Sequence, residues 1–285
     1  MLATSKTTFE TNYPHHSTPG IMKYVGLTIK KDLRLWFRYR ANFYGNVIEI
    51  AIRIAIFGML ASFTSYAGDN SLAGKNLFVF FIGGFLLWTL SSVALFAPVN
   101  AIGRDLYNGT VEFLYATPMH KYYYFMGTVL AEAIVRSFIF FPILGLLWYV
   151  SQISFLQVII ILLVCILILT VLISLGVILA LTALMWRQVT SITSVMFIVF
   201  EFLTGTYFPV QSFPKFLQYI SYLLPYTWGY DLIRYYSLEG NWVTLLPIWM
   251  EWLLILIFGV LFLILSLALL KKAEKVTKQA GLNLI

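Results

Sequence analysis

Apolar residues dominate this chain in long runs, and short polar stretches separate one run from the next. A helix needs about 20 residues, most of them apolar, to cross the roughly 30 Å hydrocarbon core of a membrane. Runs that approach or exceed this length lie at residues 43–65, 77–102, 122–149, 155–185, 190–207 and 244–270. The pattern predicts an all-α integral membrane protein whose six transmembrane helices form one domain over residues 43–270.

Residues 22–42, ahead of the first predicted span, mix apolar and cationic side chains. The cationic residues there include Lys30, Lys31, Arg34 and Arg38, and Trp36 lies among them. This mixture is typical of an amphipathic helix in the membrane interface, with its cations toward anionic lipid; a soluble helix is the alternative. The preceding residues 1–21 form a polar tail without the apolar core of a cleaved signal peptide.

The segment over residues 208–241 is apolar and aromatic, yet it contains Pro209, Pro214 and Pro225. Proline interrupts a helix because it lacks the backbone N–H and clashes with the preceding turn. No piece between these prolines is long enough to cross a membrane. We therefore expect a re-entrant hairpin of two short helices that enters the outer leaflet and turns back before the last span.

The basic residues concentrate at the two ends of the chain. Eleven of the nineteen lysines and arginines precede the first span or follow the last one, in the basic tail 271–285. By the positive-inside rule both termini are expected in the cytoplasm, in a multi-pass protein of the inner, cytoplasmic membrane. The net charge of +7 therefore indicates topology, and no nucleic-acid partner is expected.

The composition supports membrane insertion and argues against several kinds of site. Hydrophobic residues make up 60% of the chain, charged residues 11%, and the mean hydropathy is +0.86. One cysteine and three histidines cannot build a disulfide framework or a Cys/His metal site. His120, the only histidine beyond the N-terminal tail, has no nucleophile or acid that the sequence places beside it, so no catalytic residue is predicted.

Six charged residues lie inside the predicted spans, and one of them, Glu251, is near the outer end of the last span. Glu49 and Arg53 are four residues apart, as are Glu132 and Arg136, so each pair shares a helix face and can form an ion pair. Glu201 has no cationic neighbour at helical spacing. A carboxylate within a span is a candidate functional site by default, and the alternative is a glutamate that hydrogen-bonds to another helix.

A polar stretch over residues 103–118, GRDLYNGTVEFLYATP, separates the second and third spans. Thr110 can cap a short helix whose first turn contains Glu112, which suits the positive end of the helix dipole. Phe113 and Leu114 supply an apolar face, and Pro118 ends the helix. A short helix with an exposed acid and aromatic residues, presented to the cytoplasm, is typical of a docking element.

Two groups of residues resemble signatures of the permeases of ABC-2 type transporters. The first is Arg104-Asp105, Gly109 to Leu114 and Thr117-Pro118, which is similar to the family's motif after the second span. The second is Gly205, Phe208-Pro209, Phe213-Pro214, Leu224-Pro225 and Ile233-Arg234, which is similar to its pattern between the last two spans. Val111 and Phe113 depart from the commoner leucine without removing a polar contact.

The resemblance implies a type V exporter-like permease that acts as a dimer, with a second and identical permease subunit and two copies of an ATP-binding subunit. It places ATP and Mg²⁺ on that partner, because this chain has no Walker motif. The segment 103–118 would be the coupling helix, with contacts from Arg104, Asp105, Gly109, Thr110, Glu112, Phe113, Leu114 and Pro118. The first and fifth spans would line the path, near Glu49, Arg53 and Glu201.

The implied function is export of a hydrophobic or amphipathic substrate, such as a drug-like molecule, a lipid or a lipid-linked glycan. The first alternative is an ion-coupled secondary transporter that uses Glu201, Glu132 and Arg136, although such folds commonly have duplicated halves and the sequence contains no internal repeat. The second is a membrane-embedded enzyme that modifies lipids, which the absence of a histidine and nucleophile arrangement disfavours.

Overall fold

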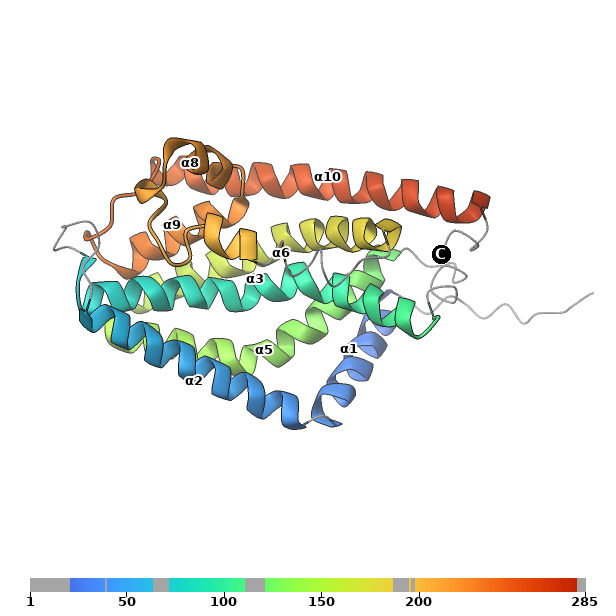
Figure 1. Ribbon diagram of the computed structural model, residues 1–285, viewed down its shortest axis with the longest axis horizontal. Coiled ribbons are helices and arrows are strands. Elements are labelled where there is room, and N and C mark those ends of the chain that lie inside the picture. The colour runs from blue at the N-terminus through green and yellow to red at the C-terminus, as the bar shows by residue number, and fades with distance from the viewer. Residues whose placement is uncertain are drawn as a thin grey trace, which may run out of the picture.

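The computed structural model describes residues 21–38, 40–63, 72–110, 121–186, 195 and 198–280, and this part of the chain is helical almost throughout (Figure 1). The helices are α1 (Ile21–Arg38), α2 (Arg40–Phe63), α3 (Lys75–Tyr107), α5 (Lys121–Ser151), α6 (Phe155–Trp186), the short 3-10 helix η2 (Val210–Ser212), α8 (Lys215–Tyr222), α9 (Pro225–Ser237) and α10 (Ile248–Ala280). Residues 198–203 are also helical.

Five helices in these described ranges are long and apolar enough to cross a membrane: α2, α3, α5, α6 and α10. They correspond to five of the six predicted spans. The remaining predicted span, 190–207, lies partly outside the described residues. Its described helical part ends at residue 203, and Gly205 follows with φ +83°, a left-handed conformation that glycine adopts without strain.

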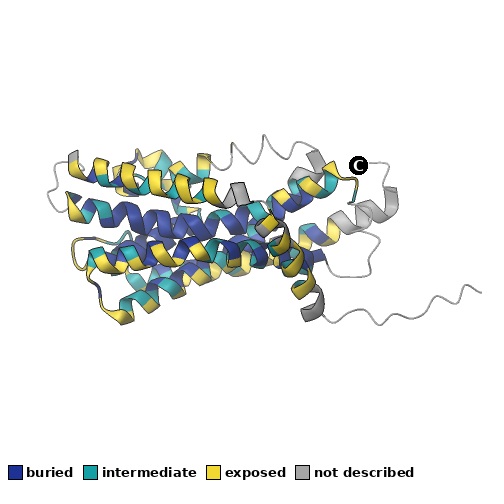
Figure 2. Ribbon diagram, turned by 90° about the horizontal axis from the view of Figure 1, so that it is seen from below, coloured by how far each residue is buried: buried dark blue, intermediate teal, exposed yellow. Residues whose placement is uncertain are grey.

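The helix α3 forms the centre of the bundle. Of its most apolar window 89% is buried, against 11% for α2 and 17% for α10, and Figure 2 shows a central helix that is buried along most of its length. It packs against α5, α6 and α9. A helix that is apolar on all sides is stable in such a central position, and the outer helices keep exposed apolar faces suited to lipid.

Glycines allow the central helices to approach closely. A Cβ atom added at Gly176 of α6 would lie 2.1 Å from the carbonyl oxygen of Ala94 in α3, far inside van der Waals contact. A Cβ at Gly84 of α3 would lie 2.9 Å from the carbonyl oxygen of Thr206. Small residues at helix interfaces bring backbones together in membrane proteins, where packing drives association.

The helix α1 lies at an angle to the other long helices, at the end of the bundle where α3 ends and α5 begins (Figure 1). It packs against α5 through Thr28, whose side chain lies 3.1 Å from a Cβ built at Gly127. The predicted interfacial residues Lys30, Lys31 and Arg34 are exposed. Arg38 is exposed as well, and the side chain of Trp36 lies outside the described residues, so the interfacial location of α1 stays a prediction.

The predicted pair of short helices is present as α8 and α9, at the end of the bundle opposite α1 (Figure 1). Each predicted proline stands at the start of a helix: Pro209 precedes η2, Pro214 precedes α8, and Pro225 opens α9. Proline is favourable there because its missing N–H would have no partner within the helix. At 13 residues, α9 spans only about 20 Å and is too short to cross.

Several helix ends differ from the predicted span boundaries. The second span was expected to end at residue 102, but α3 continues to Tyr107, so the first part of the predicted coupling segment is the last turn of α3. The last span was expected from residue 244, but α10 begins at Ile248. Pro247 explains the later start, because the residue before a proline is disfavoured in the helical region.

Candidate functional site

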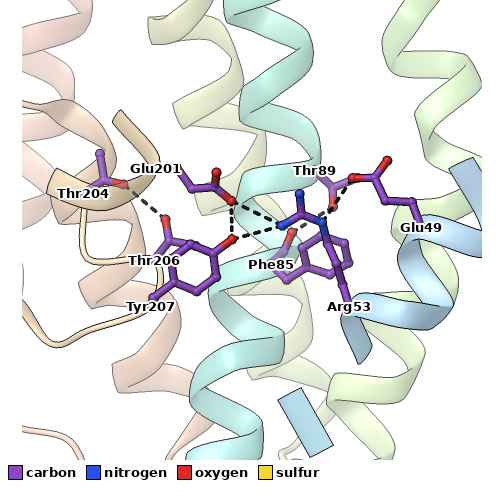
Figure 3. Close-up of polar contacts among 8 residues, drawn as sticks. All are labelled: Glu49, Arg53, Phe85, Thr89, Glu201, Thr204, Thr206 and Tyr207. Atoms are coloured by element: carbon purple, nitrogen blue, oxygen red, sulfur yellow. Dashed lines mark hydrogen bonds and ion pairs between the residues drawn. The ribbon is translucent and has the colours of Figure 1, made fainter. Parts of the chain in front are cut away.

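The predicted path residues Glu49, Arg53 and Glu201 meet in one cluster, although Arg53 and Glu201 are 148 positions apart in the chain (Figure 3). The Arg53 Nε donates to Glu49 Oε1 at 3.1 Å, and its Nη1 donates to Glu201 Oε1 at 3.3 Å. The same Nη1 donates to the hydroxyl of Tyr207 at 3.0 Å. A single guanidinium thus joins α2 to the end of the segment 198–207.

The Tyr207 hydroxyl completes this cluster by donating to Glu201 Oε1. The Phe85 ring of α3 lies 5.8 Å from the Arg53 guanidinium, a cation–π distance. Glu201 has no cationic neighbour at helical spacing, as the sequence indicates, and its cation comes instead from α2. Sequence spacing could not find this contact, which depends on how two distant helices pack.

Charges inside a membrane protein are costly unless each is paired and hydrogen-bonded. Glu201 meets both conditions, since it accepts from Arg53 and from Tyr207. The three charged side chains form a polar connection between two helical segments that expose mainly apolar residues. Such a connection can hold the segments together, and it offers a polar partner to a molecule that passes between them.

The second predicted pair, Glu132 and Arg136, is also formed. The Arg136 Nε donates to Glu132 Oε1 at 3.4 Å on the surface of α5. The hydrogen bonds of the Arg53 cluster come from α2 and residues 201–207, so in the described part of the chain this pair is a separate feature. It matches the interpretation of a simple structural ion pair.

Arg234, predicted from the motif in the second half, is a buried support behind the cluster. Its Nη2 donates to the carbonyl oxygens of Gly205 and Thr206. Its guanidinium lies 3.6 Å from the centroid of the Phe80 ring, a close cation–π contact. Arg234 therefore fixes the backbone turn that immediately precedes Tyr207 and positions the Tyr207 hydroxyl.

Sequence reasoning missed a second polar centre, between α9 and α10. Asp231 is buried and accepts from Trp242 Nε1 at 2.8 Å and from the backbone N–H of Leu245 at 2.7 Å. Glu251 is fully buried at the start of α10 and accepts from the N–H of Leu246 at 3.1 Å. These carboxyl groups cap the connection between the two helices. An acid followed at a distance by a tryptophan gives no recognisable sequence signal.

The last turn of α3 ends in a hydrogen-bond pattern centred on Asp105. Gly109 adopts φ +66°, its N–H donates to Leu106 at 3.2 Å, and the N–H of Thr110 donates to the Asp105 carbonyl at 2.8 Å. This is a Schellman motif, which stops a helix at a glycine. The Thr110 hydroxyl also donates backwards to Asp105 Oδ1 at 3.0 Å, so its observed contact is with α3.

Asp105 connects this motif to α5. The Tyr124 hydroxyl of α5 donates to Asp105 Oδ2 at 2.5 Å. Of the predicted coupling residues, Asp105 and Thr110 thus make contacts within the helix bundle, whereas Arg104 and Gly109 are exposed. Glu112, Phe113, Leu114 and Pro118 lie outside the described residues, and their contacts stay predictions.

Comparison with known proteins identifies the kind of transporter to which these features belong. A family model described as ABC-2 type transporter matches residues 24–238, from α1 through α9. The matched range contains the Arg53 cluster, the Asp105 motif and Arg234. No curated protein matches the chain.

Proposed function

The chain belongs to the ABC-2 type transporter family, and we propose that it is the permease subunit of an ATP-driven exporter in the cytoplasmic membrane. Two copies of the chain form the path, and two separate ATP-binding subunits hydrolyse ATP with Mg²⁺. The cargo is hydrophobic or amphipathic: a drug-like molecule, a lipid or a lipid-linked glycan. The family match over residues 24–238 is the observation that carries this proposal.

In this proposal both termini lie in the cytoplasm, together with α1 and the connection between α3 and α5. Support comes from the eleven basic residues near the chain ends and from the exposed cations of α1. The short helices α8 and α9 then lie on the outer side, because they are at the other end of the bundle (Figure 1).

Coupling acts through the segment 103–118 and through α1, which are proposed to contact the ATP-binding subunits. ATP binding closes those subunits and moves the segment, and hydrolysis resets it. Asp105 supports this role, because it joins the start of the segment to α5 through Tyr124. A displacement of the segment therefore has a direct mechanical connection to a membrane-spanning helix.

The transport path is proposed along α2 and the segment 198–207, where Glu49, Arg53 and Glu201 meet. Opening the path requires α2 to separate from that segment, which breaks the hydrogen bonds between Arg53, Glu201 and Tyr207. The cluster therefore acts as a polar latch between the two path-lining elements. Cargo that replaces one of its contacts would favour the open state.

Charge reversal at the coupling helix tests this function. We expect Glu112→Lys, in a complex reconstituted with its ATP-binding subunit, to reduce cargo-stimulated ATP hydrolysis by about tenfold or more, because a like charge replaces an attractive one at an interface. Glu239→Lys is the matched control, since Glu239 is exposed beyond α9 at the other end of the bundle. Normal stimulation in Glu112→Lys would contradict the proposed coupling.

The family membership argues against the two alternatives drawn from the sequence. An ion-coupled secondary transporter would stop when the ion gradient collapses and would ignore ATP. A lipid-modifying enzyme would be active as the purified chain without any ATP-binding subunit. Transport assays in vesicles with and without ATP separate all three.

A further inference from the structure

The charge of the Arg53 cluster identifies the kind of cargo that it would accept. Glu49 and Glu201 both lie within ion-pair distance of Arg53, at 3.1 Å and 3.3 Å. The two carboxylates and one guanidinium carry a formal charge of −1. We propose, on the basis of the function proposed above, that this cluster binds the cationic group of an amphipathic cargo.

The most exposed charged group of the cluster is the carboxylate of Glu49. The Glu49 side chain is 57% exposed, whereas those of Arg53 and Glu201 are 26% and 13% exposed. Arg53 already directs donors to both carboxylates and to Tyr207. An anionic ligand would have to compete with two carboxylates for Arg53. A cationic ligand can bind the exposed carboxylate of Glu49 directly.

Arg234, a buried cation behind the cluster, does not cancel the negative charge that the cluster presents at the surface. Arg234 is 2% exposed and donates to the carbonyl oxygens of Gly205 and Thr206. Its guanidinium also packs against the Phe80 ring. Its charge is therefore directed to the backbone turn, and Glu49 remains the charged group that an incoming molecule meets first.

Exposed apolar side chains lie on both helical segments that carry the cluster and would hold the rest of an amphiphile. Ile52 and Ile56 lie three and seven positions after Glu49, on the same face of α2, and both are exposed. Ile198 and Phe202 are exposed on the segment that carries Glu201. A cation with an apolar body fits this combination of one accessible carboxylate and two apolar helix surfaces.

The depth of the cluster favours cargo over a lipid headgroup. Arg53 is the middle residue of the apolar window Tyr44–Ser62 of α2. In a hydrocarbon core about 30 Å thick, the headgroups of bilayer lipids lie roughly 15 Å from this depth. A cationic cargo is the occupant that the charges support.

The ion pair of Glu132 and Arg136 on α5 is a control for the charge of the cluster. Glu132 and Arg136 on α5 repeat the four-residue spacing of Glu49 and Arg53, at 3.4 Å. This pair has one acid and one base, so its formal charge is zero. A charge effect that is specific to the cluster must appear at Glu49 and be absent at Glu132.

Two hydrophobic ions of the same shape and opposite charge test the proposal: tetraphenylphosphonium and tetraphenylborate. Their binding to the purified full chain in detergent is measured by equilibrium dialysis. We expect saturable binding of tetraphenylphosphonium that weakens about tenfold in Glu49→Gln, equivalent to about 1.4 kcal/mol. Glu132→Gln is expected to leave it unchanged. Because Glu49 is exposed, Glu49→Lys should also fold, and it is expected to reverse the preference toward tetraphenylborate.

Equal binding of the two ions, or unchanged tetraphenylphosphonium binding in Glu49→Gln, would overturn the charge assignment. Either result leaves the proposed function intact, because the dialysis contains no ATP-binding subunit. The proposed function fails separately, if no ATP-binding subunit associates with the chain or if Glu112→Lys hydrolyses ATP with normal cargo stimulation. Zwitterionic phospholipid is added as a competitor. If it displaces tetraphenylphosphonium, the cluster is a lipid site and the proposal is overturned.

Discussion

At the residue scale, Asp105 makes its side-chain hydrogen bonds within this chain. Both oxygens of its carboxylate are used within the permease: Thr110 donates to Oδ1 and Tyr124 to Oδ2. Hydrogen bonds to a charged group contribute about 1.5–3 kcal/mol, more than neutral ones. Asp105 therefore fixes the start of the segment 103–118, which is the proposed coupling segment, and its neighbour Arg104 is exposed.

Removal of the Tyr124 hydroxyl tests this positioning role. Tyr124→Phe keeps the ring but deletes the donor to Asp105, so we expect a weaker connection between the coupling segment and α5. The measurable result is a several-fold lower ratio of cargo-stimulated to basal ATP hydrolysis, with the permease still inserted and bound to its ATP-binding subunit. Tyr107→Phe is the control, since Tyr107 is exposed and lies in the same last turn of α3 as Asp105. If the two variants had the same ratio of stimulated to basal ATP hydrolysis, Asp105 would act only as a helix cap and not in coupling.

At the scale of elements, the contact between α3 and α6 depends on the absence of a side chain at Gly176. The Cβ of an alanine would lie 2.1 Å from the carbonyl oxygen of Ala94, and a backbone oxygen cannot turn away as a flexible side chain can. The two helices would have to separate. Because α3 is the central helix, this separation would disturb its contacts with α5 and α9 as well.

We therefore expect Gly176→Ala to destabilise the protein by about 3 kcal/mol or more, at the upper end of the range for overpacked interiors. Gly145→Ala is the matched control, because a Cβ at Gly145 meets nothing within 4 Å, and alanine is a better helix former than glycine. The thermal unfolding midpoint of each purified variant measures the effect. A Gly176→Ala variant with an unchanged midpoint would mean that the two helices pack less closely than described.

At the scale of the whole molecule, local patterns predicted the elements but not their contacts. Hydrophobic runs predicted the five membrane-length helices of the described residues, and the prolines marked where η2, α8 and α9 begin. The predicted end of the second span at residue 102 missed both the extension of α3 to Tyr107 and its stop at Gly109. The contact of Arg53 with Glu201, and that of Asp231 with Trp242, arise only when distant helices pack, so no periodicity reveals them.

The orientation of the molecule has a direct test, because its two ends carry exposed positions. Tyr107 ends α3, and Val243 lies in the connection between α9 and α10, at the opposite end of the bundle (Figure 1). The native Cys165 is buried and gives little background labelling. With a membrane-impermeant maleimide, Val243→Cys is expected to react in intact cells, and Tyr107→Cys only after permeabilisation. Labelling of Tyr107→Cys in intact cells would place the coupling segment outside, where no ATP-binding subunit could reach it.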